Sequence, residues 1–337
     1  MRRLATLVGQ VAALSHPDAA SGMSQRSPDS AAPHPGYWAL LFLLAALLLG
    51  ACGREDSGTT PKFSARPATP EAKPIYLLGV HPLHNPEMLF DHFQPLVDYL
   101  NRHLEGVEIR LEASRDYPSY DEKLFAGHFH LAMPNPYEAV EAERHGYRFL
   151  ARWNNDADFR GLCLVRKDSG IHSADELKGK AVAYPAPSAL AATMLPQWYL
   201  KQHGLDVHKD IDTRYVGSHE SAILNVLHGT TALGCTWPPP WRIFQKTRPA
   251  EARQLVPLFQ TDTLPSVAVM ARADVPLALV AKLGELLLHL NENEAGRQIL
   301  ATIEIPGFAV ADHATYLPVR NFITRFSEQI RLPRAEK

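Results

Sequence analysis

Two polar residues stand at places where a strand ends or a helix begins, and from there they could bind a small ligand. His219 precedes the helical apolar pattern of residues 220–227, and Asn135 follows the short apolar segment 129–133, between two prolines. Helix N-termini attract anions, and ligands of α/β sheets bind beyond the carboxyl ends of strands. We therefore expect both residues to contact a small anion, with helix capping as the alternative role.

Three cysteines are present, Cys52, Cys163 and Cys235, and none belongs to a Cys-x-x-Cys pair, so a structural zinc site is not expected. Cys163 is expected to pack within a strand. Cys235 lies two residues before Trp237, near the expected site, where it could pack, meet a soft ligand or form a disulfide with Cys163. The spacing alone does not place the two thiols within bonding distance.

Several classes of function are not supported by the sequence. The net charge is −2 and the pI is near 6.8, so no basic surface for nucleic acid is indicated. The chain contains no Gly-x-Ser-x-Gly, His-Glu-x-x-His, P-loop or dinucleotide motif, and we expect neither an enzyme nor a cofactor. His81 and His84 have a spacing that could bind a metal, but a solvated turn is the favoured interpretation and no metal is expected.

Strands and helices alternate along most of the chain, which predicts an α/β fold with mostly parallel sheets. Strand-like runs are expected at residues 75–80, 107–111, 129–133, 149–153, 162–166, 180–184 and 213–216. Helical patterns are expected at residues 89–104, 117–126, 137–145, 189–202 and 220–227.

The N-terminal part looks like a targeting segment. Residues 37–51 are apolar and uncharged, but they are fewer than the roughly 20 that a comfortable transmembrane helix needs. They fit the apolar region of a signal peptide, so residues 1–51 are expected to be removed, with Met23 as an alternative start. Residues 53–73 are rich in Gly, Ser, Thr and Pro and are expected to form a flexible tether.

The signal segment ends in Leu49-Gly50-Ala51-Cys52, which resembles the lipobox of bacterial lipoproteins. This resemblance implies that Cys52 is lipidated and that residues 52–73 tether the protein to a membrane on the periplasmic side. Gly53, at the position after Cys52, permits sorting to the outer membrane by the same resemblance.

From about residue 75 to 330 the chain resembles the phosphonate-binding proteins of ABC importers, within the periplasmic solute receptors. The segments that carry the resemblance are Gly79-Val80-His81-Pro82, Asp116-Tyr117, Phe129-His130-Leu131-Ala132, Lys167-Asp168-Ser169-Gly170-Ile171, Asp175-Glu176-Leu177-Lys178-Gly179-Lys180 and Tyr215-Val216-Gly217-Ser218-His219-Glu220. It implies two lobes joined by a two-strand hinge, with lobe 1 at 75–165 plus 265–330 and lobe 2 at 166–262. The crossings are expected near 163–167 and 258–265.

The expected ligand contacts combine this resemblance with the positions of strand ends and helix starts. They are Tyr117, Asn135, Tyr137, Ser188, Ala189, His219, Cys235 and Trp237. Two departures from the family pattern are visible. The family's Ser-Thr-Ser-Gly anion loop corresponds to residues 189–192, which have no hydroxyl, and its acidic residue corresponds to Ala232. We therefore expect a ligand that is smaller, more apolar or softer than an aminoalkyl phosphonate.

The resemblance implies a receptor that binds a small phosphonate-like or other oxyanion between its lobes and delivers it to an ABC permease. An alternative role is a sensory receptor that presents a ligand, arsenite among the candidates because of Cys235, to a membrane histidine kinase. In both cases the partners are a small molecule and a membrane protein.

Overall fold

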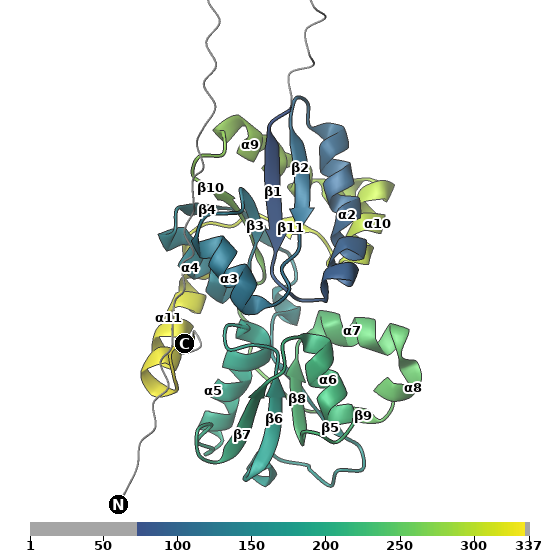
Figure 1. Cartoon of the computed structure of the whole chain (residues 1–337), viewed down its shortest axis with the longest axis vertical. Helices are drawn as coiled ribbons and strands as arrows, with labels where there is room; N and C mark the ends of the chain where they lie inside the picture. Colours follow the sequence, from purple (N-terminus) through teal and green to yellow (C-terminus); the bar gives the residue numbers. More distant parts are fainter. Residues whose placement is uncertain (1–72, 334–337) are drawn as a thin grey trace, which may run out of the picture. The chain divides into compact units, whose positions relative to one another are not determined.

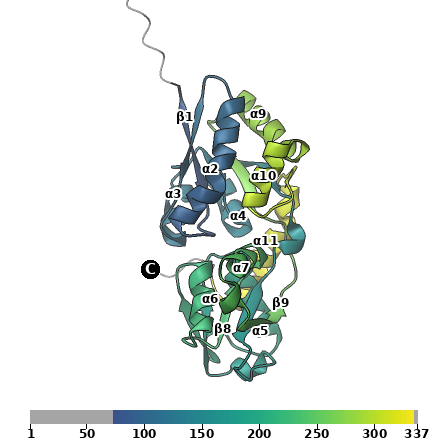
Figure 2. The ribbon, with the colours of Figure 1, turned by 90° about the vertical axis from the view of Figure 1, so that its right-hand side faces the viewer.

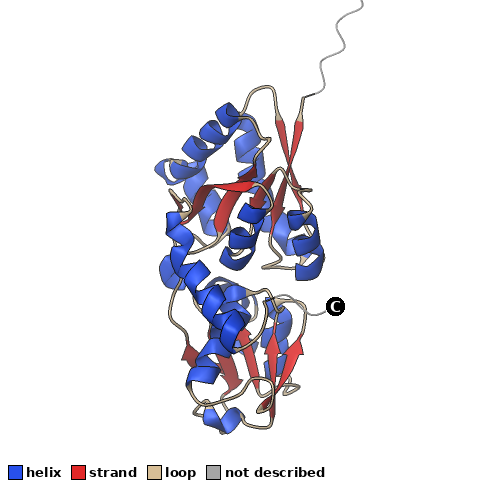
Figure 3. Ribbon diagram, turned by 90° about the vertical axis from the view of Figure 1, so that its left-hand side faces the viewer, coloured by secondary structure: helices blue, strands red, loops and turns tan. Residues whose placement is uncertain are grey.

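A computed structural model describes residues 73–333, which belong to one compact unit. Their strands form two sheets, one of six strands and one of five, each covered by helices (Figures 1 and 3). The α/β class and the two-lobed arrangement expected from the sequence are therefore confirmed. The expected tether and lipidation site, residues 52–72, lie outside the described residues.

Lobe 1 contains the six-stranded sheet, in the order β11-β4-β10-β3-β1-β2. Its strands are β1 (Ile75–Val80), β2 (Glu108–Glu112), β3 (Leu131–Met133), β4 (Tyr147–Trp153), β10 (Ala268–Arg272) and β11 (Phe308–Ala309). Its helices are α2 (Pro86–His103), α3 (Tyr117–Phe125), α4 (Pro136–Arg144), α9 (Leu277–Leu288), α10 (Glu294–Thr302) and α11 (Leu317–Gln329). Helix α2 packs against β2 of this sheet, and α10 lies beside α2 (Figure 2).

Lobe 2 contains the five-stranded sheet, in the order β7-β6-β8-β5-β9. Its strands are β5 (Leu162–Arg166), β6 (Lys180–Tyr184), β7 (Ile211–Tyr215), β8 (Leu233–Thr236) and β9 (Leu255–Gln260). Its helices are α5 (Leu195–Gln202), α6 (His219–Leu227), α7 (Pro238–Thr247) and α8 (Pro249–Ala252), with a single π-helical turn, Leu190–Met194, leading into α5.

Strand pairing is mixed, which corrects the expectation of mostly parallel sheets. β1 pairs in parallel with β2 and β3, and β6 pairs in parallel with β7 and β8. β10 and β5 instead run antiparallel to both of their neighbours. These are the strands that follow each passage of the chain between lobes, so they enter their sheets from the opposite end.

The two crossings lie slightly away from their expected places. β5 pairs with β8 and β9, so lobe 2 begins at Leu162 rather than at residue 166. The first crossing is therefore the segment 154–161, and the second is the segment 261–267. The expected first crossing at 163–167 was wrong because that apolar run is an inner strand of the second sheet.

The chain also reaches lobe 2 a third time, at its C-terminal end. Helix α11 packs on α4 of lobe 1, and the Phe322 ring contacts the Trp198 ring of α5 at 5.9 Å. Beyond the helix, Arg331 donates hydrogen bonds to Gln197 Oε1 (3.0 Å) and to the Pro187 carbonyl (2.9 Å). Among the helices of residues 73–333, none has the length and apolar character needed to cross a membrane.

Candidate functional site

A small cavity lies where the two lobes meet. It has a volume of about 10 Å³, which is roughly the space needed for one water molecule. It is lined by His81, Tyr117, Asn135, Phe159, Ala189, Leu190, Ala191, Ala192, His219 and Trp237. The lining contains no carboxylate, lysine or arginine. Its polar side chains include those of His81, Tyr117, Asn135 and His219.

Five helical segments begin at this cavity. Tyr117 and His219 are the first residues of α3 and α6, whereas Asn135, Ala189 and Trp237 cap α4, the π-turn before α5, and α7. The first N–H groups of a helix have no intrahelical acceptor, and the helix dipole makes this end positive. Helix α7 begins with three prolines and offers no N–H group in its first turn, but the other helix starts direct their positive dipole ends at a cavity without a cationic side chain, which suits a small anion.

Local sequence signals fix these helix starts. The side chain of Asp116 accepts a hydrogen bond from Ser119 N at the start of α3, and Ser218 does the same from Ser221 N at the start of α6. In α4, Asn135 and Glu138 form a reciprocal capping box.

Tyr117 and His219 join the two lobes directly. Tyr117 Oη lies 3.0 Å from His219 Nε2, and the other ring nitrogen of His219, Nδ1, lies 3.2 Å from Thr236 Oγ1. Burial, followed by repulsion from His81 and His84, lowers the pKa of His219 well below its usual range. Burial also raises the pKa of Tyr117, assisted by the charges of Glu138 and Asp121. Both groups are therefore neutral at physiological pH.

His81 is buried rather than solvated, so the expectation of an exposed turn was wrong. Only 2% of the residue is exposed, and its Nδ1 lies 3.0 Å from the Met133 carbonyl. Burial is the main reason that the pKa of His81 falls to about 4. The ring packs near Tyr117 and Trp153, with centroid distances of 6.2 and 6.5 Å, which a reading of the Pro-containing turn alone does not reveal.

The π-turn itself brings residues 190–192 into the cavity lining. Ala189 makes no side-chain cap, in agreement with the missing hydroxyls. Ser188 does not line the cavity, but its carbonyl accepts a hydrogen bond from Asn135 Nδ2 at 3.2 Å across the lobes. Asn135 Oδ1 accepts from the N–H groups of Tyr137 and Glu138, so this amide acts mainly in positioning.

Aromatic rings close the cavity on the side of the first crossing. The Trp237 ring of lobe 2 stacks on Trp153 of lobe 1 at 6.2 Å and contacts Phe159 edge-on at 5.5 Å. Trp237 was expected from the sequence, whereas Phe159 and Thr236 were missed. A phenylalanine in a crossing segment and a threonine at a strand end carry no local signal that marks them as site residues.

Besides Ser188, two further expected residues lie outside the cavity lining. Tyr137 is buried on α4 and lines a separate groove beside α11. Cys235 faces the core of lobe 2, where it forms a disulfide with Cys163 on the neighbouring strand β5. In this state Cys235 has no free thiol, so it cannot bind a soft ligand. Among the described residues no cluster of three or more metal-ligating side chains occurs.

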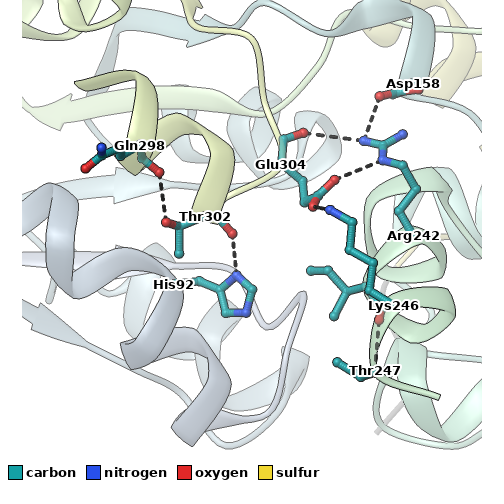
Figure 4. A network of polar contacts seen from close by, with 9 residues as sticks. His92, Asp158, Arg242, Lys246, Thr247, Gln298, Thr302 and Glu304 are labelled. Atoms are coloured by element: carbon teal, nitrogen blue, oxygen red, sulfur yellow. Dashed lines mark hydrogen bonds and ion pairs between the residues drawn. The ribbon is translucent and has the colours of Figure 1, made fainter. Parts of the chain in front are cut away.

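A network of charged side chains forms a second contact between the lobes. Figure 4 shows Arg242 and Lys246 of α7 directed at Glu304, which follows α10. Arg242 Nε lies 3.1 Å from Glu304 Oε2, its Nη2 lies 2.9 Å from Asp158 in the first crossing, and Lys246 also pairs with Glu304. Glu304 holds a left-handed backbone conformation, with φ of 60°.

Comparisons with known proteins point to one family. Residues 78–316 match the family described as the periplasmic substrate-binding protein of phosphonate ABC transporters. The structure is similar to PhnD1 from Prochlorococcus marinus in complex with methylphosphonate, with a TM-score of 0.70, 18% identity, and coverage of 75% of this chain and 98% of that one. It is equally similar to a binding protein component of an ABC phosphonate transporter from Pseudomonas aeruginosa (TM-score 0.70, 18% identity, coverage 76% and 87%).

A curated relative of another kind is the tetrathionate sensor histidine kinase TtrS of Salmonella typhimurium. It is 25% identical over 158 residues, which are 44% of this chain. The match spans only 26% of the kinase.

Proposed function

Because this chain belongs to the family of periplasmic substrate-binding proteins of phosphonate ABC transporters, we propose that it captures a small phosphonate-like oxyanion between its lobes and delivers it to an ABC permease. The observation that carries the proposal is the convergence of five helix starts on one small cavity that is lined by uncharged side chains. A site of this kind attracts an anion through backbone dipoles.

Capture would work by lobe closure. The cavity in this structure is about the size of one water molecule, so a ligand needs the lobes to move apart before it enters. Once inside, it contacts Tyr117 and Asn135 of lobe 1 together with His219 and the 190–192 segment of lobe 2. Contacts made only in the closed arrangement shift the population toward it, and the permease would respond to that arrangement.

The membrane anchor is part of the same proposal. A lipid on Cys52 would hold the receptor at the periplasmic face of a membrane, with the outer membrane permitted by Gly53. Residues 53–73 would then form the tether. Mass spectrometry of the protein purified from bacterial membranes tests this, because acyl chains on Cys52 are lost in Cys52→Ala.

Ligand-dependent stabilisation tests the capture function. The panel contains phosphate, phosphite, methylphosphonate, aminoethylphosphonate, sulfate, arsenite and tetrathionate, each with wild type and His219→Ala. A ligand at roughly 100 times its Kd adds about 2.7 kcal/mol to the free energy of unfolding, a visible thermal shift. A shift with a phosphonate or phosphite that His219→Ala removes supports the proposal, and no shift with any oxyanion refutes it.

A second candidate function is that of a sensory receptor that presents its ligand to a membrane histidine kinase. The match to the tetrathionate sensor kinase favours it, and it suggests a sulfur oxyanion as the ligand. The disulfide removes the argument for arsenite that rested on Cys235. A thermal shift with tetrathionate and none with phosphonates would favour the sensor.

Catalysis is not part of the proposal. The matched family is one of binding proteins, and the cavity lining has no thiol, carboxylate, serine or lysine to serve as a nucleophile.

A further inference from the structure

The two histidines of the cavity offer different chemistry to a ligand. His219 already has a hydroxyl group beside each ring nitrogen, and a hydroxyl can donate or accept. His81 has no such freedom. Its Nδ1 faces the Met133 carbonyl at 3.0 Å, and a carbonyl oxygen only accepts. The proton of the neutral His81 ring therefore lies on Nδ1, and Nε2 carries a lone pair.

The surroundings of His81 keep the ring neutral. The groups that face it are Tyr117 from α3, Trp153 from β4 and the Met133 carbonyl from β3. The charged form of His81 would be repelled by the charged forms of His84 and His219, and the pKa of His81 is already about 4 because of burial. Nothing in the cavity lining supplies a carboxylate that would stabilise an imidazolium.

A second negative charge on the ligand has little to balance it. Backbone N–H groups and helix dipoles attract an anion of any charge, but the lining contains no lysine or arginine. Behind Tyr117, the Glu138 carboxyl is fully buried and bonded to Asp121. Burial and the neighbouring Asp121 raise the pKa of Glu138, so this pair supplies no positive charge that could balance a dianion. A bare oxygen of a dianion would also meet the lone pair of His81 Nε2, which is repulsive.

We propose that the ligand binds as a monoanion that keeps one acidic hydroxyl, which it donates to His81 Nε2, while its charged oxygens accept from the N–H groups of residues 190–192. This inference rests on the proposed function and narrows its ligand class. It selects hydrogen phosphonates, of the form R–PO₂(OH)⁻, over phosphonate dianions and over sulfonates, which are ionised but carry no hydroxyl.

The test uses the full chain in detergent, with methylphosphonate and methanesulfonate as ligands of nearly equal shape. Calorimetry from about pH 6 to about pH 9 measures the affinity, and ³¹P NMR reports the protonation of bound methylphosphonate. We expect the affinity for methylphosphonate to fall about tenfold per pH unit above the second pKa of the free ligand. The bound phosphorus resonance should keep the chemical shift of the monoanion throughout, and methanesulfonate should bind at least about tenfold more weakly.

Two variants assign the effect to His81. His81→Phe should bring the affinities for the two ligands within about threefold of each other, because the acceptor is gone. His84→Gln, in the same loop but outside the cavity lining, should keep the preference for methylphosphonate. The inference is overturned if the affinity rises with pH, if the bound resonance is that of the dianion, or if both ligands bind equally to wild type. Absence of binding of either ligand at every pH refutes the proposed function itself, and the inference with it.

Discussion

Tyr117 at the start of α3 and His219 at the start of α6 meet across the two lobes, with 3.0 Å between Oη and Nε2. Both residues are almost completely buried, at 2% exposure each. Because this hydrogen bond joins one lobe to the other, separating the lobes would break it, and we expect it to contribute to the closed state and to ligand binding in that state.

Removing the Tyr117 hydroxyl should therefore weaken ligand capture. For Tyr117→Phe we expect the Kd for methylphosphonate to rise about fivefold to thirtyfold, since a lost hydrogen bond of this kind corresponds to about 1–2 kcal/mol. Tyr120→Phe is the matched control, because Tyr120 is equally buried on the same helix and its hydroxyl has no hydrogen-bond partner. Calorimetry measures the Kd of both variants. Equal losses of affinity in the two would show that the hydrogen bond between the lobes is unimportant for binding.

Restoring a hydroxyl to the anion loop should strengthen binding. Ala189 caps the π-turn without a side-chain hydrogen bond, and a serine at such a position typically stabilises a helix start by about 1 kcal/mol. In Ala189→Ser we expect a higher melting temperature and about a tenfold lower Kd for methylphosphonate, from a hydroxyl directed at the ligand. Ala186→Ser adds the same group at a buried residue outside the lining and should leave the Kd unchanged. A higher Kd for methylphosphonate in Ala189→Ser would indicate that the cavity has no room for the hydroxyl.

The charged network at Glu304 should make closure sensitive to salt and acid. Although burial pushes the pKa of Glu304 up, hydrogen bonds and charges from Lys246 and Arg242 outweigh it and hold this pKa below the usual 4.5. A carboxyl with a lowered pKa stabilises the structure above about pH 4.5, and this contribution is lost as the pH falls through the lowered value.

Glu304→Gln should raise the Kd about threefold at low salt, with a smaller effect at high salt. Calorimetry at two ionic strengths measures this. Glu294→Gln breaks an exposed pair with Arg297 inside lobe 1 and should change neither the affinity nor its salt dependence. If the two variants behave alike, the Glu304 network does not couple the lobes.

The Cys163–Cys235 disulfide should stabilise lobe 2 without taking part in binding. It joins strands β5 and β8 across a separation of 72 residues, and removal of such a bond typically costs about 2–5 kcal/mol of unfolding free energy. Urea denaturation should show this loss in Cys163→Ala, in Cys235→Ala and in the reduced wild type. The double variant should lose no more than either single one, and arsenite should not stabilise the oxidised protein. Full stability after reduction would contradict the assigned role.

The elements were largely predictable because their signals are local. The expected strands at 75–80, 162–166 and 180–184 coincide with β1, β5 and β6, since each is an apolar run bounded by turn residues. Helix α2 begins at Pro86, earlier than the apolar pattern suggested, because Asn85 caps it and Met88 donates to that cap. The direction of strand pairing was not predictable in the same way. β5 and β10 run antiparallel to their neighbours because each follows a passage of the chain between lobes, and a local sequence pattern contains no information on that passage.

The site was predictable only in part, for a similar reason. Tyr117, Asn135, Ala189, His219 and Trp237 stand at strand ends or helix starts, and the structure brings all five to one cavity. His81 was misjudged because its burial depends on Trp153 and on lobe 2 closing over it, which are contacts far away in the sequence. Cys235 was misplaced because alternation along β8 decides whether a side chain faces the core or the cleft, and a one-residue difference reverses the answer.

The hydrogen bonds of Arg331 to Pro187 and Gln197 make a third connection between lobes that two crossing segments already join. Two connecting segments permit twisting as well as bending, whereas a third attachment restricts the twist. The open receptor would then be preorganised to close along a single path, and less rotational freedom would be lost when a ligand is enclosed. Tight binding of a very small solute, which offers few contacts, depends on keeping that entropic cost low.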